Sequence, residues 1–261
     1  MNGVSIYREM ATANPAVGLA ISLGENARPA TDLTAHVHFD VCPTWLEFAI
    51  RHLSDAQVAQ VARITAWKGA DENSKAAALE WEFEASMQSI MASSIALDAF
   101  CAAVQTKVLP PQSATDQRRE KRIPRHAEIS EVLRIAFSLT AKEVSNLRQN
   151  LGEIFRFRDL AIDSSSRSGA PILHPELRVG GEWRFAYFRC ENARLIVTAT
   201  LRLIRELVTS DKPKDAHVQK YIDVLRSRFE RLQNSTVLRA APAATDAHTA
   251  YTEHSRLPSG R

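Results

Sequence analysis

The chain has 261 residues, of which 45% are hydrophobic and 24% charged, ordinary values for a globular protein long enough to bury a core. Its 9 glycines and 11 prolines are too few to supply the turns of an all-β protein, so the composition favours helices. The formal net charge of +3 permits contact with nucleic acid, but a charge this small does not argue for it.

Cysteine usage and hydropathy favour a reduced compartment. The three cysteines, Cys42, Cys101 and Cys190, lie far apart without a C-x-x-C pair, so they indicate neither a disulfide framework nor a zinc ribbon. We find no apolar run approaching the roughly 18–20 residues that cross a bilayer, and the stretch from Pro15 to Leu23 is too short for a secretion signal. The expected localisation is therefore cytoplasmic.

Residues 1–44 are expected to form a small N-terminal appendage of mixed or β structure. Polar and apolar residues alternate from Thr34 to Val41, as they do in a half-buried strand. Residues 5–10 and 17–23 are candidate partner strands, so the appendage differs in character from the rest of the chain.

Two histidines and a carboxylate share one face of that expected strand. His36, His38 and Asp40 have the spacing at which two imidazoles and a carboxylate hold a metal ion. No further ligand or supporting hydrogen-bond partner is recognisable, and alternating histidines on an edge strand need only exposure to explain them. We therefore expect no metal site.

Residues 45–233 have helical periodicity and predict a bundle of long antiparallel helices. Ser54 with Gln57, and Thr140 with Glu143, are capping boxes that mark helix starts. Apolar residues recur at steps of three and four in each segment, and Pro110 with Pro111 ends the longest one. Helices are predicted over residues 54–67, 74–108, 127–139, 141–162, 182–209 and 213–233. Residues 234–261 lose this periodicity and are predicted to be a disordered tail.

The predicted loop over residues 109–126 contains the densest basic cluster in the chain. Its candidate RNA-binding residues are Arg118, Arg119, Lys121, Arg122 and Arg125, with His126 following. Such a cluster can contact RNA phosphates, and that contact depends strongly on salt. The alternative is a solvated loop of mixed charge, which is what most charge runs are.

One position breaks the apolar stripe of the helix predicted over residues 141–162. Val144, Leu147, Leu151 and Ile154 share a face, and four residues further on that face reaches Arg158. A guanidinium on an apolar face is costly to bury unless it is paired. Arg158 therefore either pairs with a carboxylate such as Asp159 or Glu182 and pins the helix end, or lines a cleft that binds negative charge.

The segment from Phe155 to Asp163, FRFRDLAID, resembles the end of the third helix in HEPN-family domains. These are helical bundles in which an R-[ND]-x-x-x-H motif sits in the cleft of a homodimer; many members are metal-independent RNases and others are catalytically silent. Arg158 and Asp159 match the motif, whereas Asp163 occupies the histidine position. That histidine takes part in the acid–base chemistry, and a carboxylate cannot act as the same cationic acid.

The resemblance extends over about residues 75–210. The segment from Ala85 to Phe100 is similar to the first bundle helix of such proteins, and His174-Pro-Glu-Leu177 followed by Trp183-Arg-Phe185 is similar to a loop-and-helix pattern of bacterial relatives. His174, in the long loop predicted over residues 163–181, can stand in for the missing histidine if that loop folds back. The alternative is that His174-Pro is simply a turn.

These patterns lead to one leading expectation and two alternatives. The resemblance implies a dimeric HEPN-like module that binds RNA or a protein partner without standard RNase activity. The first alternative is a ribonuclease that uses Arg158 and Asp159 with Asp163 or His174; the second is a structural scaffold in which Arg158 contributes only stability. Neither a glycine-rich phosphate loop nor a G-x-S-x-G elbow occurs, so no cofactor is expected.

Overall fold

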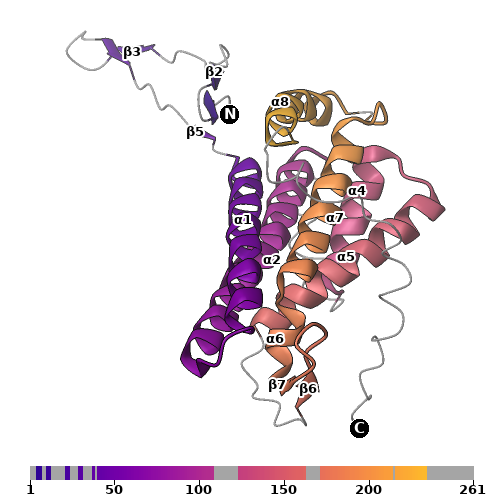
Figure 1. Cartoon of the computed structure of the whole chain (residues 1–261). Coiled ribbons are helices and arrows are strands. Elements are labelled where there is room, and N and C mark those ends of the chain that lie inside the picture. Colours follow the sequence, from indigo (N-terminus) through magenta and orange to yellow (C-terminus); the bar gives the residue numbers. More distant parts are fainter. Residues whose placement is uncertain are drawn as a thin grey trace.

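The structure is a computed structural model, and it confirms that the protein is mostly α-helical. It describes residues 40–108, 123–162, 171–213 and 215–233, with backbone alone at 231 and 233, and the backbone of five short strands within residues 1–39. Seven helices lie in this described part, and they surround one hydrophobic core (Figure 1). The predicted tail over residues 234–261 lies outside the described residues.

Helices α1 (Cys42–Ala66) and α2 (Glu72–Val108) pack side by side as a hairpin (Figure 1). The predicted start of α1 at Ser54 is wrong, because the helix begins twelve residues earlier. Pro43 occupies the first turn, where its missing N–H costs nothing, and Asp40 Oδ1 accepts a hydrogen bond from the Cys42 amide at 2.9 Å. Ser54 is therefore a mid-helix residue rather than a cap.

Helix α2 is the centre of the fold, since it packs against each of the other six described helices. By length and composition it is apolar enough to span a bilayer, which corrects the expectation that no such run exists. In the structure 56% of its most apolar window is buried inside the protein. The core position of α2 accounts for this hydropathy.

Helices α4 (Arg125–Phe137) and α5 (Ala141–Ile162) follow, joined by a short turn. Ser138 ends α4 in the left-handed conformation with φ of 50°. The predicted capping box is confirmed: the Thr140 amide donates to Glu143 Oε2 at 2.8 Å, and Thr140 Oγ1 accepts from the Glu143 amide at 3.4 Å. Hydrogen bonds from Lys212 and from Thr140 lower the pKa of Glu143 to about 2.

The single helix predicted over residues 182–209 is wrong in one respect, because the chain forms two helices there. Strands β6 (Ile172–Leu173) and β7 (Gly180–Gly181) pair antiparallel, and α6 (Trp183–Tyr187) follows. Arg189 then takes an extended conformation before α7 (Cys190–Val208) begins. Glu82 of α2 explains the break, since its Oε1 accepts the Cys190 amide at 3.0 Å and so caps α7 from outside the segment.

The last described helix is α8 (Ala216–Gln233). Asp215, which precedes it, caps its first turn, since Asp215 Oδ1 accepts hydrogen bonds from the amides of His217 and Val218. Helix α8 lies at one end of the fold, and α6 with the β6–β7 hairpin lies at the opposite end (Figure 1). Aromatic contacts connect α8 to α2 and α4. The ring centroid of Phe100 in α2 lies 6.4 Å from that of Phe137 in α4 and 6.1 Å from that of Tyr221 in α8.

The structure describes five strands within residues 1–39. They are β1 (Val4–Tyr7), β2 (Met10–Thr12), β3 (Ile21–Leu23), β4 (Pro29–Thr31) and β5 (Val37–His38). Strand β1 pairs antiparallel with β2 and parallel with β5, while β3 pairs antiparallel with β4. Of the strand expected over residues 34–41, the structure describes β5 over Val37–His38, whereas Asp40 and Val41 lie outside any strand. His36 lies outside the described residues, and so does the side chain of His38.

Candidate functional site

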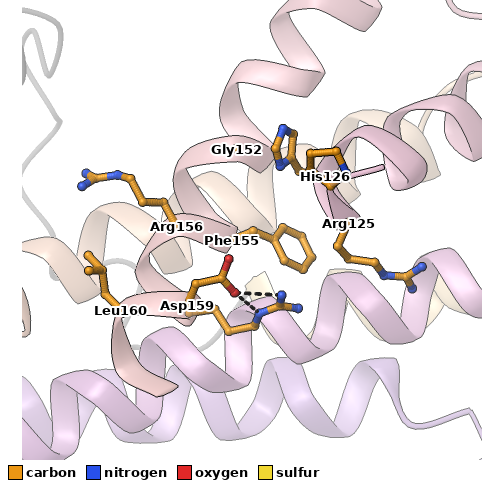
Figure 2. A pocket seen from close by; sticks show the side chains of 9 residues that line it. Arg125, His126, Gly152, Phe155, Arg156, Asp159 and Leu160 are labelled. Atoms are coloured by element: carbon orange, nitrogen blue, oxygen red, sulfur yellow. Dashed lines mark hydrogen bonds and ion pairs between the residues drawn. The ribbon is translucent and has the colours of Figure 1, made fainter. Parts of the chain in front are cut away.

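A pocket of about 440 Å³ lies between the start of α4 and the second half of α5. Its volume is within the range of about 300–1,000 Å³ that small-molecule sites occupy. Figure 2 shows Arg125 and His126 of α4 on one side and Phe155, Arg156 and Asp159 of α5 on the other. Its lining residues are Pro124, Arg125, His126, Gly152, Phe155, Arg156, Arg158, Asp159 and Leu160.

Arg158, which breaks the apolar stripe of α5, is half-buried at the pocket wall and held by two carboxylates. Its Nε and Nη2 donate to Asp159 Oδ1 at 3.1 and 2.9 Å, and its Nη1 donates to Asp98 Oδ2 at 3.1 Å. The guanidinium also covers the ring of Phe155, 4.4 Å from its centroid. Pairing with Asp159 was expected; Glu182 instead pairs with Arg184.

Asp98 connects three helices and is the residue that sequence reasoning missed here. It projects from α2, and each of its two oxygens accepts a hydrogen bond from a different helix. Asp98 Oδ2 accepts from Arg158 of α5, and Asp98 Oδ1 accepts from Arg125 Nε of α4 at 2.6 Å. Arg125 Nη1 also donates to Glu128 at 2.8 Å, and these hydrogen bonds outweigh the effect of burial and raise the pKa of Arg125. The available signal was a lone carboxylate in the apolar run from Ile95 to Phe100.

Basic residues outnumber acidic ones among the residues that line the pocket, since Arg125, Arg156 and Arg158 stand against Asp159. The guanidinium of Arg156 covers the rings of Phe157 and Tyr187 and donates to Glu153. The other paired carboxylates, which include Asp98, are not lining residues. Helix α4 points its N-terminus at the pocket, and its N-cap residue makes no side-chain hydrogen bond to the first turn. A site of this kind suits an anion such as phosphate.

The remaining predicted site residues lie elsewhere or outside the described part of the chain. Asp163, Arg118, Arg119, Lys121 and Arg122 all lie outside the described residues. Of the basic cluster, the structure therefore places Arg125 and the neighbouring His126, both in the pocket. Among the described residues, no group of three His, Cys, Asp or Glu side chains is arranged to hold a metal ion.

The structure does not bring His174 to Arg158. His174 lies in a turn beside Arg63, which pairs with Glu82 of α2. Arg158 instead pairs with Asp98, sixteen residues further along α2, which is about 24 Å at the rise of an α-helix. Within one chain His174 therefore cannot replace the motif histidine, and the turn interpretation of His174-Pro is the one that the structure supports.

A second group of charged side chains surrounds His174, and no sequence pattern predicted it. Arg63 and Glu82 are only 1% and 2% exposed and pair directly, and Arg63 also pairs with Glu176. Arg189 donates to Glu176 Oε1 at 3.0 Å. Burial alone lowers the pKa of Arg63, but hydrogen bonds to Glu82 and Glu176 outweigh it, so the pKa is raised. These groups form a neutral, internally paired cluster.

Comparisons of the chain with protein families, curated proteins and solved structures find no match. The HEPN resemblance accordingly depends on Arg158, Asp159 and the flanking segments alone. The pocket geometry is independent of that resemblance, since it follows from the contacts of α2, α4 and α5.

Proposed function

We propose that the protein is a HEPN-like helical binding module that holds RNA phosphate in the pocket between α4 and α5. The observation that carries the proposal is a pocket of about 440 Å³ whose lining residues include three arginines and a single acidic residue. In this proposal the described helices are part of a bundle of long antiparallel helices with a small N-terminal appendage, and the protein acts in the cytoplasm.

The fixed position of Arg158 supports this function. Three of its five N–H groups are used by Asp98 and Asp159, which leaves two for a ligand among the contacts of the described residues. A guanidinium that is already oriented loses less conformational entropy when it binds phosphate. Arg125 is held in the same way, so two donors are positioned before RNA arrives.

The pocket is better suited to the RNA backbone than to base recognition. The ring of Phe155 is buried and covered by Arg158, so it offers no face on which a base can stack. Binding is then driven by phosphate contacts and tolerates many sequences. The basic cluster over residues 118–122 ends two positions before Pro124 in the sequence, and in this proposal it adds further phosphate contacts.

Standard HEPN ribonuclease chemistry is not part of the proposal. Asp163 stands at the motif histidine, and a carboxylate cannot supply the imidazolium acid. His174 lies beside Arg63, whose partner Glu82 is sixteen residues, or about 24 Å along α2, from Asp98, the partner of Arg158. The ribonuclease alternative would have to operate with Arg158, Asp159 and Asp163.

Arg158→Ala and Arg156→Ala are expected to weaken binding of a labelled, mixed-sequence single-stranded RNA several-fold, measured by fluorescence anisotropy. Each phosphate contact contributes about 0.7 to the slope of log affinity against log salt. The wild-type slope between about 50 and 200 mM salt should therefore fall by about that amount in each variant, and the RNA should be recovered intact.

Arg202→Ala is the matched control, since it removes one positive charge from an exposed residue of α7 that pairs with Glu206 away from the pocket. Equal weakening by all three variants would show only non-specific attraction. Absence of RNA binding by the wild-type protein at low salt would overturn the proposal and favour a protein partner or a scaffold. Metal-free cleavage lost in Arg158→Ala would establish the ribonuclease alternative.

The resemblance also implies a homodimer, in which the two motifs share one cleft. The expected mass in solution is then twice the 29.0 kDa of the chain. Light scattering at micromolar concentration measures this directly. A monomer would remove the composite cleft and leave a pocket formed by one chain, which the RNA-binding measurement tests separately.

A further inference from the structure

The β6–β7 hairpin is fastened to the α1–α2 hairpin through one residue of its turn. Glu176 pairs with Arg63, which is buried in α1 and pairs in turn with Glu82 of α2. The other Glu176 oxygen accepts Arg189, which lies just before α7. The position of the hairpin on the helices therefore depends on how the turn presents Glu176.

The ring of His174 shapes that turn. His174 Nδ1 accepts two backbone hydrogen bonds, from the amides of Glu176 and Leu177, both at 3.2 Å. The turn closes with Arg178 at a positive φ of 55° and a hydrogen bond from its amide to the His174 carbonyl at 2.9 Å. Since Nδ1 must be an acceptor, the imidazole is neutral and carries its proton on Nε2.

The surroundings of His174 offer nothing to stabilise a second proton on the ring. The residue is 4% exposed, and Nε2 is buried without a hydrogen-bond partner among the described residues. Charged groups face it from each neighbouring element: Arg63 from α1, Glu176 from its own turn and Arg189 from before α7. Glu82 of α2 is already engaged by Arg63 and by the Cys190 amide.

We propose that His174 is an acid-sensitive latch between the β6–β7 hairpin and the α1–α2 hairpin. Protonation of Nδ1 converts the acceptor of two backbone N–H groups into a donor that faces them. The turn then loses its shape, Glu176 leaves Arg63 and Arg189, and residues 171–181 detach from the helices. The opening is local because residues 171–181 contribute nothing to the main apolar core, which the helices form.

The direction of the pH effect follows from the charges. Burial, then Arg63, and to a lesser extent Arg189 lower the pKa of His174 in the closed turn, and together they outweigh the opposing effect of Glu176. In the open turn the pKa returns to its ordinary value of about 6.5. The open form therefore binds more protons below that value, so the closed latch is most stable above it and weakens as the pH falls.

Hydrogen–deuterium exchange of the wild-type protein tests the latch. Protection factors of peptides covering residues 172–181, corrected for intrinsic exchange, should fall several-fold between about pH 7.5 and pH 5. The largest possible fall in the protection factor is about 30-fold, and it is reached if His174 stays neutral in the closed form at both pH values. Protection of α1 and α7 peptides should change far less, because global unfolding is not involved.

His174→Asn separates the latch from other acid effects. The Asn side-chain oxygen can accept the same backbone N–H groups and does not titrate, so this variant should lose the pH dependence of residues 172–181. His52→Asn, on the surface of α1, should retain it. Equal protection of the wild-type segment at both pH values, or an unchanged fall in His174→Asn, would overturn the proposal.

Discussion

Arg63→Met is expected to lower the free energy of unfolding by about 3–5 kcal/mol, the usual loss when one member of a buried ion pair is removed. The variant leaves Glu82, 2% exposed, without the guanidinium that compensates its charge, and it frees Glu176 from the helix hairpin. Equilibrium unfolding in urea, followed by circular dichroism, measures the loss, provided that the slope of the unfolding free energy against urea concentration is the same in both proteins.

The double variant Arg63→Met, Glu82→Met identifies the source of that loss. Removing both charges should restore much of the stability, because an apolar pair avoids the desolvation of two ions. Recovery will be incomplete, since Glu82 also accepts the Cys190 amide and caps α7. Arg202→Ala breaks an exposed pair and should cost less than about 1 kcal/mol. A similarly small loss in Arg63→Met would show that the cluster contributes little to stability.

The helical class and several boundaries were predictable because they depend on local chemistry. The Thr140–Glu143 capping box marks the start of α5, and the three- and four-residue spacing in α2 requires only neighbouring turns of one helix. Local reasoning failed at Ser54, which has the pattern of a cap but lies within a helix that begins at Cys42 and has Pro43 in its first turn. A helix start upstream therefore overrode a local signal.

The break between α6 and α7 was not predictable from the segment itself. Residues 182–209 have a continuous apolar stripe, and the interruption at Arg189 depends on Glu82, which lies 108 positions before Cys190. The buried cluster has the same origin, since Arg63 and Glu176 are 113 positions apart. Pairings at such separations require the tertiary fold, so sequence spacing cannot reveal them.

The candidate pocket shows an intermediate case. Arg158 and Asp159 were found because a charge interrupts an apolar stripe, and Arg125 because it ends a basic cluster. Their common partner, Asp98, comes from a third helix and was visible only as a carboxylate in an apolar run. A broken pattern therefore identified the charged residues, while their arrangement required the packing of α2 against α4 and α5.

Phe100→Ala is expected to lower the free energy of unfolding by about 3–5 kcal/mol, because it removes a fully buried ring and leaves a cavity that the surrounding helices fill only in part. The ring stacks on Phe137 at an interplanar angle of 28° and contacts Tyr221, so the cavity opens between α2, α4 and α8. Urea unfolding measures the total loss of stability. In hydrogen exchange, the amides of α4 and α8 should lose protection before those of the other helices.

Phe100→Leu retains most of the apolar volume and should lose less stability, which separates cavity formation from loss of the aromatic contacts. Ile135→Ala, at an exposed position of α4, is the control for truncation of an apolar side chain outside the core. Phe100 lies two residues after Asp98, and α4 carries Arg125, so loosening this junction should also weaken RNA binding at the pocket. A large loss of stability with unchanged RNA affinity would show that the pocket is maintained by the Asp98 ion pairs rather than by the aromatic packing beneath them.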